Sequence, residues 1–411
     1  MPELRLPPVP VLTPPYHTPE REAVQAEARR FAMEEVLPLA NELDPQKAEI
    51  PRWFLEKIGK QGYFGIRIPT EAGGMGLGAF EYCMISEELA RAWMSVASII
   101  ARAQGGGTQH VIGERRRELL GRSARGEWIG AAGLSEPTAG SDLANVQTRA
   151  VLDGDEWVIT GQKRWTGNAK AADWLSLLVR VSDPQPGQSR SAGMATIIVE
   201  KERDAFPEGV TAKLIDKIGY HGFLTWNLTF EGLRVPAAAM AGWAARQSGE
   251  APQGGRSAFA DVEAGLNVAR VHTAARAVGL ARAALEDCIT YAQERVQFQH
   301  PIADFQAIRF KIAEMAARVE QARAFYRQVA HLIDLGVPCE REAAMVKLMA
   351  TEMAVEVTGD GIQLHGGNGY TTERQVERHW RDARLTTIFE GTSQIQQRII
   401  SDRLLPRSPL S

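Results

Sequence analysis

The character of the chain changes at one stretch, GLSEPTAGSD, which spans residues 133–142. Before it, apolar residues recur with the period of a helix. After it, short alternating apolar and polar runs are separated by Gly, Pro and Asp turns, which is typical of antiparallel strands. The sequence therefore predicts a helical first domain followed by a small antiparallel β domain, whose strands include 157–160, 174–180, 195–200 and 224–230.

Helices are predicted on both sides of this β region. Thr18 caps a helix that begins at Pro19, and amphipathic segments follow over 53–60 and 80–103. The polar, Gly-rich run at 247–255 indicates a flexible loop, and long Ala-, Leu- and Arg-rich runs after it predict the antiparallel helices of a bundle. We therefore expect three domains, at 1–130, 131–245 and 258–411.

Composition narrows the possible functions. The chain has 411 residues, 44% hydrophobic and 24% charged, with a net charge of −3, so neither nucleic acid nor an anionic membrane is an expected partner. Cys83, Cys288 and Cys339 are widely spaced, which argues against disulfides and a metal site and for a reducing, cytoplasmic location. No secretory signal and no membrane-spanning segment is predicted.

A candidate catalytic base lies in the run IFEGTSQIQ at 388–396. Glu390 is flanked by Ile388 and Phe389, and a carboxylate partly stripped of water is a stronger base. Gly391 allows a ligand to approach the backbone closely. The alternative is ordinary capping of a helix by Thr392 or Ser393 with a glutamate nearby.

Two further runs suggest a ligand. QLHGGNGYTTE at 363–373 holds three glycines, more than the end of a helix requires, and GLSEPTAGSD supplies hydroxyl and backbone donors for a polar heterocycle or a phosphate. Each run is also compatible with a plain loop. The glycine cluster at 73–78 lacks GxGxxG spacing and a preceding strand, so it gives little support to a dinucleotide-binding fold.

Together, in this order and spacing, the three runs resemble the acyl-CoA dehydrogenase family of flavoproteins. The resemblance covers nearly the whole chain and extends to GQKRW at 161–165, KIG at 217–219, RVP at 234–236, and Arg295, Gln297, Phe298, Phe305 and Gln306. It implies a helical domain, a β-barrel-like domain and a four-helix bundle, assembled as a homotetramer. It also implies FAD, an acyl-CoA substrate and a role in fatty acid metabolism.

The resemblance assigns roles to particular residues. Glu390 corresponds to the base. Positions that correspond to FAD contacts are Leu134, Ser135, Trp165, Thr166, Arg295, Gln297, Phe298, Gln306, Gln363, Gly366, Gly367, Thr392 and Gln394. Positions that correspond to substrate contacts are Ser141, Asn267, Arg270 and Gly391. Taken singly, Trp165 is compatible with a core aromatic and each arginine with a surface ion pair.

Three positions depart from the family pattern. Gly167 replaces a hydroxyl residue that faces the flavin, so either Thr166 makes that hydrogen bond or the flavin is tuned differently. Gln299 replaces a glycine, which predicts an altered turn. Asn267 replaces an aspartate and removes a negative charge near the substrate.

The implied chemistry is 2,3-dehydrogenation of an acyl-CoA, in which Glu390 removes the α-proton and electrons pass to an electron-transfer flavoprotein. Alternatives are a carrier-protein thioester, oxygen as acceptor, or a non-enzymatic branch linked to nucleic acid, which the balanced charge after Phe259 disfavours. The segment at 93–102 is expected to shape the acyl pocket. Arg102 there suits a polar or acidic acyl end, or is a solvated helix-end arginine.

Overall fold

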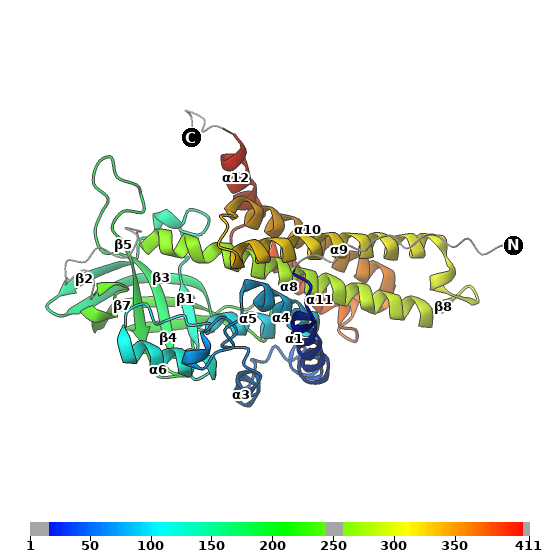
Figure 1. Cartoon of the computed structure of the whole chain (residues 1–411), viewed down its shortest axis with the longest axis horizontal. Helices are drawn as coiled ribbons and strands as arrows, with labels where there is room; N and C mark the ends of the chain where they lie inside the picture. Colours follow the sequence, from blue (N-terminus) through cyan, green and yellow to red (C-terminus); the bar gives the residue numbers. More distant parts are fainter. Residues whose placement is uncertain (1–15, 244–257, 406–411) are drawn as a thin grey trace.

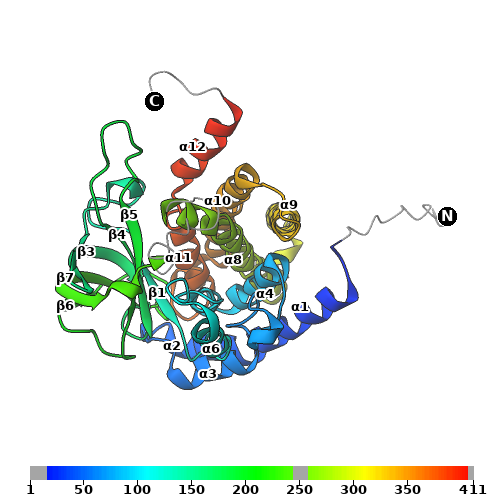
Figure 2. The same ribbon diagram turned by 60° about the vertical axis from the view of Figure 1, so that its left-hand side comes forward.

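The computed structural model describes residues 16–243 and 258–405 (Figure 1). The loop predicted at 247–255 lies outside the described residues. A helical segment, a sheet and a set of long helices follow one another along the chain, and the sheet lies beside one end of the long helices in both views (Figure 2). No helix within the described ranges is long and apolar enough to cross a membrane.

The first segment is helical, as predicted, and Thr18 Oγ1 accepts the N–H of Arg21 at its start. The single helix predicted over 80–103 is wrong, because the backbone is extended at Trp93 (φ −159°). The Trp93 indole packs against the backbone of Gly222, where an added Cβ would lie 2.3 Å from the ring. The helices are α1 (Pro19–Phe31), a π-helical turn (Ala32–Val36), α2 (Leu37–Leu43), α3 (Arg52–Lys60), α4 (Ala79–Ala92), α5 (Met94–Ile99) and α6 (Gly113–Ala124).

The sheet is curled and mixed, rather than purely antiparallel as predicted. Its order is β1-β4-β2-β3-β7-β6, with β5 paired to β4. β1 runs parallel to β4, because the chain passes through the β2–β3 hairpin before it returns, and parallel pairing needs such a crossover. The strands are β1 (Gly130–Gly133), β2 (Arg149–Asp153), β3 (Glu156–Gly167), β4 (Trp174–Arg180), β5 (Met194–Glu200), β6 (Val210–Leu214) and β7 (Thr225–Pro236).

Long helices form the last segment. α8, α9 and α10 pack on one another, α11 packs against α8 and α10, and α12 extends away from them (Figures 1 and 2). A hairpin, β8 (Val296–Gln297) and β9 (His300–Pro301), joins α8 to α9 at the end remote from the sheet (Figure 1). The helices are α8 (Ala258–Glu294), α9 (Gln306–Asp334), α10 (Glu340–His365), α11 (Val376–Thr386) and α12 (Ser393–Leu404).

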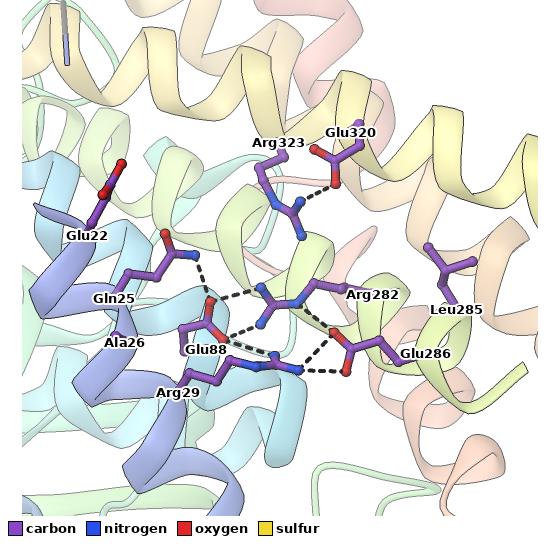
Figure 3. Close-up of a pocket in the computed structure, with 10 residues that line it drawn as sticks. All are labelled: Glu22, Gln25, Ala26, Arg29, Glu88, Arg282, Leu285, Glu286, Glu320 and Arg323. Atoms are coloured by element: carbon purple, nitrogen blue, oxygen red, sulfur yellow. Dashed lines mark hydrogen bonds and ion pairs between the residues drawn. The ribbon is translucent and has the colours of Figure 1, made fainter. Parts of the chain in front are cut away.

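A buried charged network ties α4 to α8 and α9. Glu87 accepts from Arg323 Nε at 3.0 Å and from the Tyr326 hydroxyl at 2.5 Å, and Arg282 pairs with both Glu87 and Glu88. Figure 3 shows three of its members, Glu88, Arg282 and Arg323, among the side chains that line an open cleft of ≈ 520 Å³. Because these buried charges are met by opposite charges, we interpret the cleft as a structural contact.

Candidate active site

Glu390 lies in the short loop between α11 and α12. Its φ is +53° and that of Gly391 is +87°, so the backbone takes a left-handed turn at both residues. The Thr392 hydroxyl accepts the N–H of Ile395 at 3.3 Å and caps α12, so the capping prediction is confirmed. Capping of α12 by Thr392 is compatible with a role of Glu390 as a base, because different residues supply the two functions.

Three hydrogen bonds from side chains on α10 and α12 hold this turn. Gln396 Nε2 donates to the carbonyls of Glu390 (3.2 Å) and Gly391 (2.9 Å), and Lys347 Nζ donates to that of Gly391 at 2.6 Å. A left-handed conformation costs a non-glycine residue about 1–2 kcal/mol. The bonds from Gln396 and Lys347 offset that cost and fix the direction in which the Glu390 carboxylate leaves the backbone.

Lys347 is fully buried on α10, and this burial lowers the pKa of its ammonium to about 8. Glu390 and Glu352 oppose the shift, while Arg270 and Arg276 add to it. The lysine therefore still carries its proton at neutral pH and places a positive charge beneath the Glu390 turn. The sequence analysis missed Lys347 and Gln396; a lysine within the apolar run at 343–350 was the available signal.

The predicted apolar shielding of Glu390 is half wrong. Ile388 is 50% exposed, whereas the Phe389 ring points inward. Its neighbours are the ring of Tyr220, with centroids 6.4 Å apart, and the guanidinium of Arg276, 4.8 Å from the Phe389 centroid. Phe389, packed between Tyr220 and Arg276, therefore excludes water beside Glu390. The exposed Ile388 adds little to this exclusion.

The predicted pair Asn267 and Arg270 lies on one face of α8. Arg270 Nη1 donates to Asn267 Oδ1 at 2.7 Å, and the arginine is buried. Such a guanidinium suits the anionic parts of a CoA thioester.

The loop at 134–142 is anchored by a buried ion pair. Lys163 Nζ lies 2.7 Å from Glu136 Oε1 and donates to the Leu134 carbonyl at 3.1 Å. Glu136 also accepts the backbone N–H groups of Gln147 and Thr148. Burial lowers the pKa of Lys163 to about 8, although Glu136 opposes the shift. This anchor presents the predicted ligands Leu134 and Ser135, while Ser141 lies exposed further along the loop.

Trp165 and Thr166 lie at the end of β3. The Trp165 side chain is 54% exposed and its φ is +63°. Thr166 is buried, and its hydroxyl has no hydrogen-bond partner among the described residues. At Gly167 an added Cβ would lie 2.1 Å from the Phe223 ring, which explains the glycine there. An exposed indole beside an unpartnered buried hydroxyl fits a flat, polar-edged ring such as a flavin.

A second group of predicted ligands gathers at the far end of α8. The Tyr291 ring stacks on His365, with centroids 4.3 Å apart, and its hydroxyl accepts from Asn368 Nδ2 at 2.9 Å. These contacts join the last turn of α8 to the end of α10 and the 3-10 turn that follows it. The residues brought together there are all exposed: Arg295, Gln297, Phe298, Gln306, Gln363, Gly366 and Gly367. Added Cβ atoms at both glycines would meet open space, so the backbone is bare.

The turn at Gln299, which the sequence predicts to be altered, has a left-handed backbone. Phe298 and Gln299 both take left-handed φ values, +51° and +69°, and the hairpin pairs Gln297 with His300. Gln299 thus adopts a conformation that glycine reaches more easily.

The structure does not bring the two groups of predicted FAD ligands together within one chain. At 1.5 Å per residue, Glu294 at the end of α8 lies about 36 Å beyond Arg270, and Arg295 follows it. Figure 1 likewise shows the β8 hairpin at the end of the molecule opposite the sheet that carries Trp165. Thr392 and the exposed Gln394 lie with Glu390, at the start of α12.

Three sequence profiles match this chain. They describe the acyl-CoA dehydrogenase N-terminal domain over residues 18–127, the middle domain over 131–233 and the C-terminal domain over 259–405. The chain belongs to the acyl-CoA dehydrogenase family, which is a family of oxidoreductases.

The names of relatives within the family refer to different substrates. A 3-(aryl)acrylate reductase from Clostridium sporogenes is 34% identical over 95% of this chain and 100% of its own. A (2S)-methylsuccinyl-CoA dehydrogenase from Cereibacter sphaeroides is 36% identical over 94% of this chain and 70% of its own. The family therefore leaves the acyl group of this chain's substrate open.

Solved structures share the fold. Butyryl-CoA dehydrogenase from Megasphaera elsdenii superimposes with a TM-score of 0.84 at 29% identity, over 95% of this chain and 100% of its own. A chain from a study of the electron transferring flavoprotein of Acidaminococcus fermentans gives 0.85 at 31%, over 96% and 100%. A Mycobacterium smegmatis glutaryl-CoA dehydrogenase in complex with FADH2 gives 0.85 at 24%, over 96% and 97%. Neighbours in this family are FAD-binding proteins.

Proposed function

We propose that this protein is an FAD-dependent acyl-CoA dehydrogenase that converts an acyl-CoA to the trans-2-enoyl-CoA, with Glu390 as the base. The observation that carries the proposal is the Glu390 turn. A carboxylate is held there in a left-handed conformation by Lys347 and Gln396, next to the Phe389 ring. Strain of this kind persists where the surroundings enforce it, and it is concentrated at functional sites.

The protein's own groups perform the proton chemistry. The Glu390 carboxylate removes the α-proton, and the thioester carbonyl gains enolate character as that proton leaves. The backbone N–H of Glu390 donates to no acceptor within the described part of the chain, so it is available to the thioester oxygen. When bound, FAD supplies the acceptor for the hydride that leaves the β-carbon.

Different side chains would bind the flavin ring and the CoA moiety. Ser135, Trp165 and Thr166 would hold the flavin ring, while Arg270 and Asn267 would meet the CoA moiety. A cleft of ≈ 240 Å³ lies on the sheet and the loop that carries Ser135, lined by residues that include Pro137, Gln162, Lys163, Arg164 and Asn227. These features support binding of an extended, polar cofactor and substrate along this face.

We propose an electron-transfer flavoprotein as the acceptor of the electrons. The structural likeness to a chain from a study of such a flavoprotein supports this choice. The test compares the rate with oxygen alone and the rate with an electron-accepting dye, in the presence of a series of acyl-CoAs. Dye-dependent turnover with slow reaction toward oxygen supports a dehydrogenase, whereas rapid turnover with oxygen alone would make the protein an oxidase.

The separation of the two FAD half-sites supports a homo-oligomer, which we propose is a tetramer. Arg295 and the bare Gly366–Gly367 backbone of one subunit would then complete the FAD site of its neighbour. Phe298, 85% exposed in the isolated chain, fits such a contact between subunits.

Replacement of Arg295 by alanine is expected to lower FAD content and subunit assembly together. Loss of a charged hydrogen bond to a diphosphate costs about 1.5–3 kcal/mol, and ligand binding and assembly are linked. Flavin absorbance and analytical ultracentrifugation measure the two effects. Arg318→Ala, which removes an exposed ion pair with Glu356, is the control. A monomer that keeps its full FAD content would contradict the proposal.

Replacement of Lys347 by methionine is expected to lower kcat about 10- to 100-fold with little change in KM. The change removes a charged hydrogen bond to the Gly391 carbonyl, which is worth about 1.5–3 kcal/mol, so the Glu390 turn loses its fixed direction. Steady-state kinetics measure the effect, and Lys311→Met, at an exposed pair with Asp360, is the matched control. A kcat within twofold of wild type in Lys347→Met would show that the turn does not depend on the lysine.

A further inference from the structure

Arg276 is a buried cation close to the candidate base. It lies on α8 and is 4% exposed. Its Nη1 donates to Ser98 Oγ at 2.6 Å and its Nη2 to Thr273 Oγ1 at 2.8 Å, while its Nε has no partner within the described residues. The guanidinium also covers the ring of Phe389, the residue that directly precedes Glu390 in the sequence.

The partners of Arg276 are unusual for a buried arginine. Arg282 lies less than two turns further along the same helix and is also buried, yet it pairs with the carboxylates of Glu87 and Glu88. No carboxylate within ion-pair distance of Arg276 is found in the described ranges; its partners are neutral hydroxyls. A buried charge without a counter-charge is costly, and proteins tolerate it where an anion binds.

The groups around Arg276 include a neutral histidine, a second arginine and a carboxylate. His272 is neutral, because burial and the nearby Arg276 hold its pKa well below the ordinary value, and its Nε2 has no partner among the described residues. Arg102 is half-buried over the Phe223 ring, 5.3 Å from its centroid. Of the carboxylates nearby, Asp382 accepts the backbone N–H of Tyr220 at 2.6 Å.

Ser98 connects this cluster to the segment that is predicted to shape the acyl pocket. It belongs to α5, in the segment at 93–102 that the sequence analysis expects to shape that pocket. A substrate whose α-carbon lies at Glu390 would extend its acyl chain past Phe389, between α5 and α8, toward Arg276. The guanidinium therefore faces the part of the substrate that distinguishes one acyl group from another.

We propose that Arg276, held by Ser98, binds a carboxylate at the distal end of the acyl chain, so that the substrates are CoA monothioesters of short dicarboxylic acids. This inference rests on the proposed dehydrogenase function. The substrate carboxylate would take the free Nε and one terminal nitrogen of Arg276, which is the paired geometry that guanidinium and carboxylate prefer. A neutral acyl chain would leave the cation uncompensated, so the site would select against it.

The test compares kcat/KM for succinyl-, glutaryl- and adipyl-CoA with kcat/KM for butyryl-, pentanoyl- and hexanoyl-CoA, on the FAD-loaded enzyme. Wild type should prefer at least one of the dicarboxylic thioesters to its neutral partner of the same length. In Arg276→Gln the ratio for that pair should fall about 100-fold, the loss expected when a paired charged contact is removed. Arg276→Lys keeps the positive charge but loses the paired N–H donors of the guanidinium. Its ratio should therefore lie between those of wild type and Arg276→Gln.

The possible outcomes are distinguishable. If wild type prefers the neutral thioester of every pair, or if Arg276→Gln leaves the ratio unchanged, the inference is overturned while the dehydrogenase function stands. If no thioester reduces the flavin, the proposed function itself fails. FAD content and melting temperature show whether Arg276→Gln has folded. If it has not, the wild-type ratios alone decide, because a preference for neutral chains contradicts the inference without any variant.

Discussion

Glu390→Gln is expected to bind FAD and acyl-CoA almost as well as wild type, yet to reduce the flavin at least about 1000-fold more slowly. Glutamine keeps the size of the side chain and the backbone that Gln396 and Lys347 hold, but it cannot accept the α-proton. Because proton removal and hydride departure act on neighbouring carbons, loss of the base slows both. Anaerobic stopped-flow measurement of flavin bleaching, with a substrate that wild type accepts, gives the rate.

A second carboxylate provides the control for this prediction. Ala269 precedes Arg270 on α8, and its side chain takes no proton. Adding Ala269→Glu to Glu390→Gln should restore part of the rate, since Ala269 precedes Arg270 on the helix beside the Glu390 turn. Bleaching of Glu390→Gln within tenfold of wild type would mean that the base has been misassigned.

Glu136→Ala is expected to destabilise the protein by about 3–5 kcal/mol and to weaken FAD binding, because it leaves Lys163 buried without its counter-charge. Lys163 is fully buried, and Glu136 also accepts two backbone N–H groups that would lose their partner. The loop that carries Ser135 would then lose its anchor. Chemical denaturation and FAD titration measure the two effects.

The control for Glu136 lies in the same loop. Asp142→Ala removes an exposed ion pair with Arg190, so it should cost no more than about 1 kcal/mol. The effect of Glu136→Ala should also depend on pH. Lys163 and backbone donors hold the pKa of Glu136 below its ordinary 4.5, so its stabilisation is present above that pH and is lost as the pH falls through the lower value. A pH-independent loss, or one equal to that of Asp142→Ala, would contradict this account.

Local patterns predicted much of the fold. The strand expected at 174–180 is β4 (Trp174–Arg180), because an apolar run between turn residues has few alternatives in this context. The break at Trp93 was not predictable, since an apolar residue suits a helix equally well and only the close packing on Gly222 favours the extended backbone. Parallel pairing of β1 with β4 depends on the path of the chain, which strand patterns do not contain.

The same limit applies to the site. Glu390, Gly391 and Thr392 are adjacent in sequence, so their run could be recognised directly. Lys347 supports that turn from another helix, and its position in an apolar run could equally belong to a lysine that reaches solvent. Arg276 likewise appears in the sequence as one of many arginines on an Ala-rich helix. Whether a carboxylate in the described residues pairs with it depends on tertiary packing, which the local sequence does not contain.

The central claim is that this protein oxidises an acyl-CoA with bound FAD. The most direct measurement is anaerobic titration of the purified protein with the series of dicarboxylic and neutral acyl-CoAs, followed by flavin absorbance. The account predicts a yellow protein whose flavin bleaches with at least one thioester and whose product is the trans-2-enoyl-CoA. A protein that contains and binds no FAD, or whose flavin stays oxidised with every thioester, would contradict it.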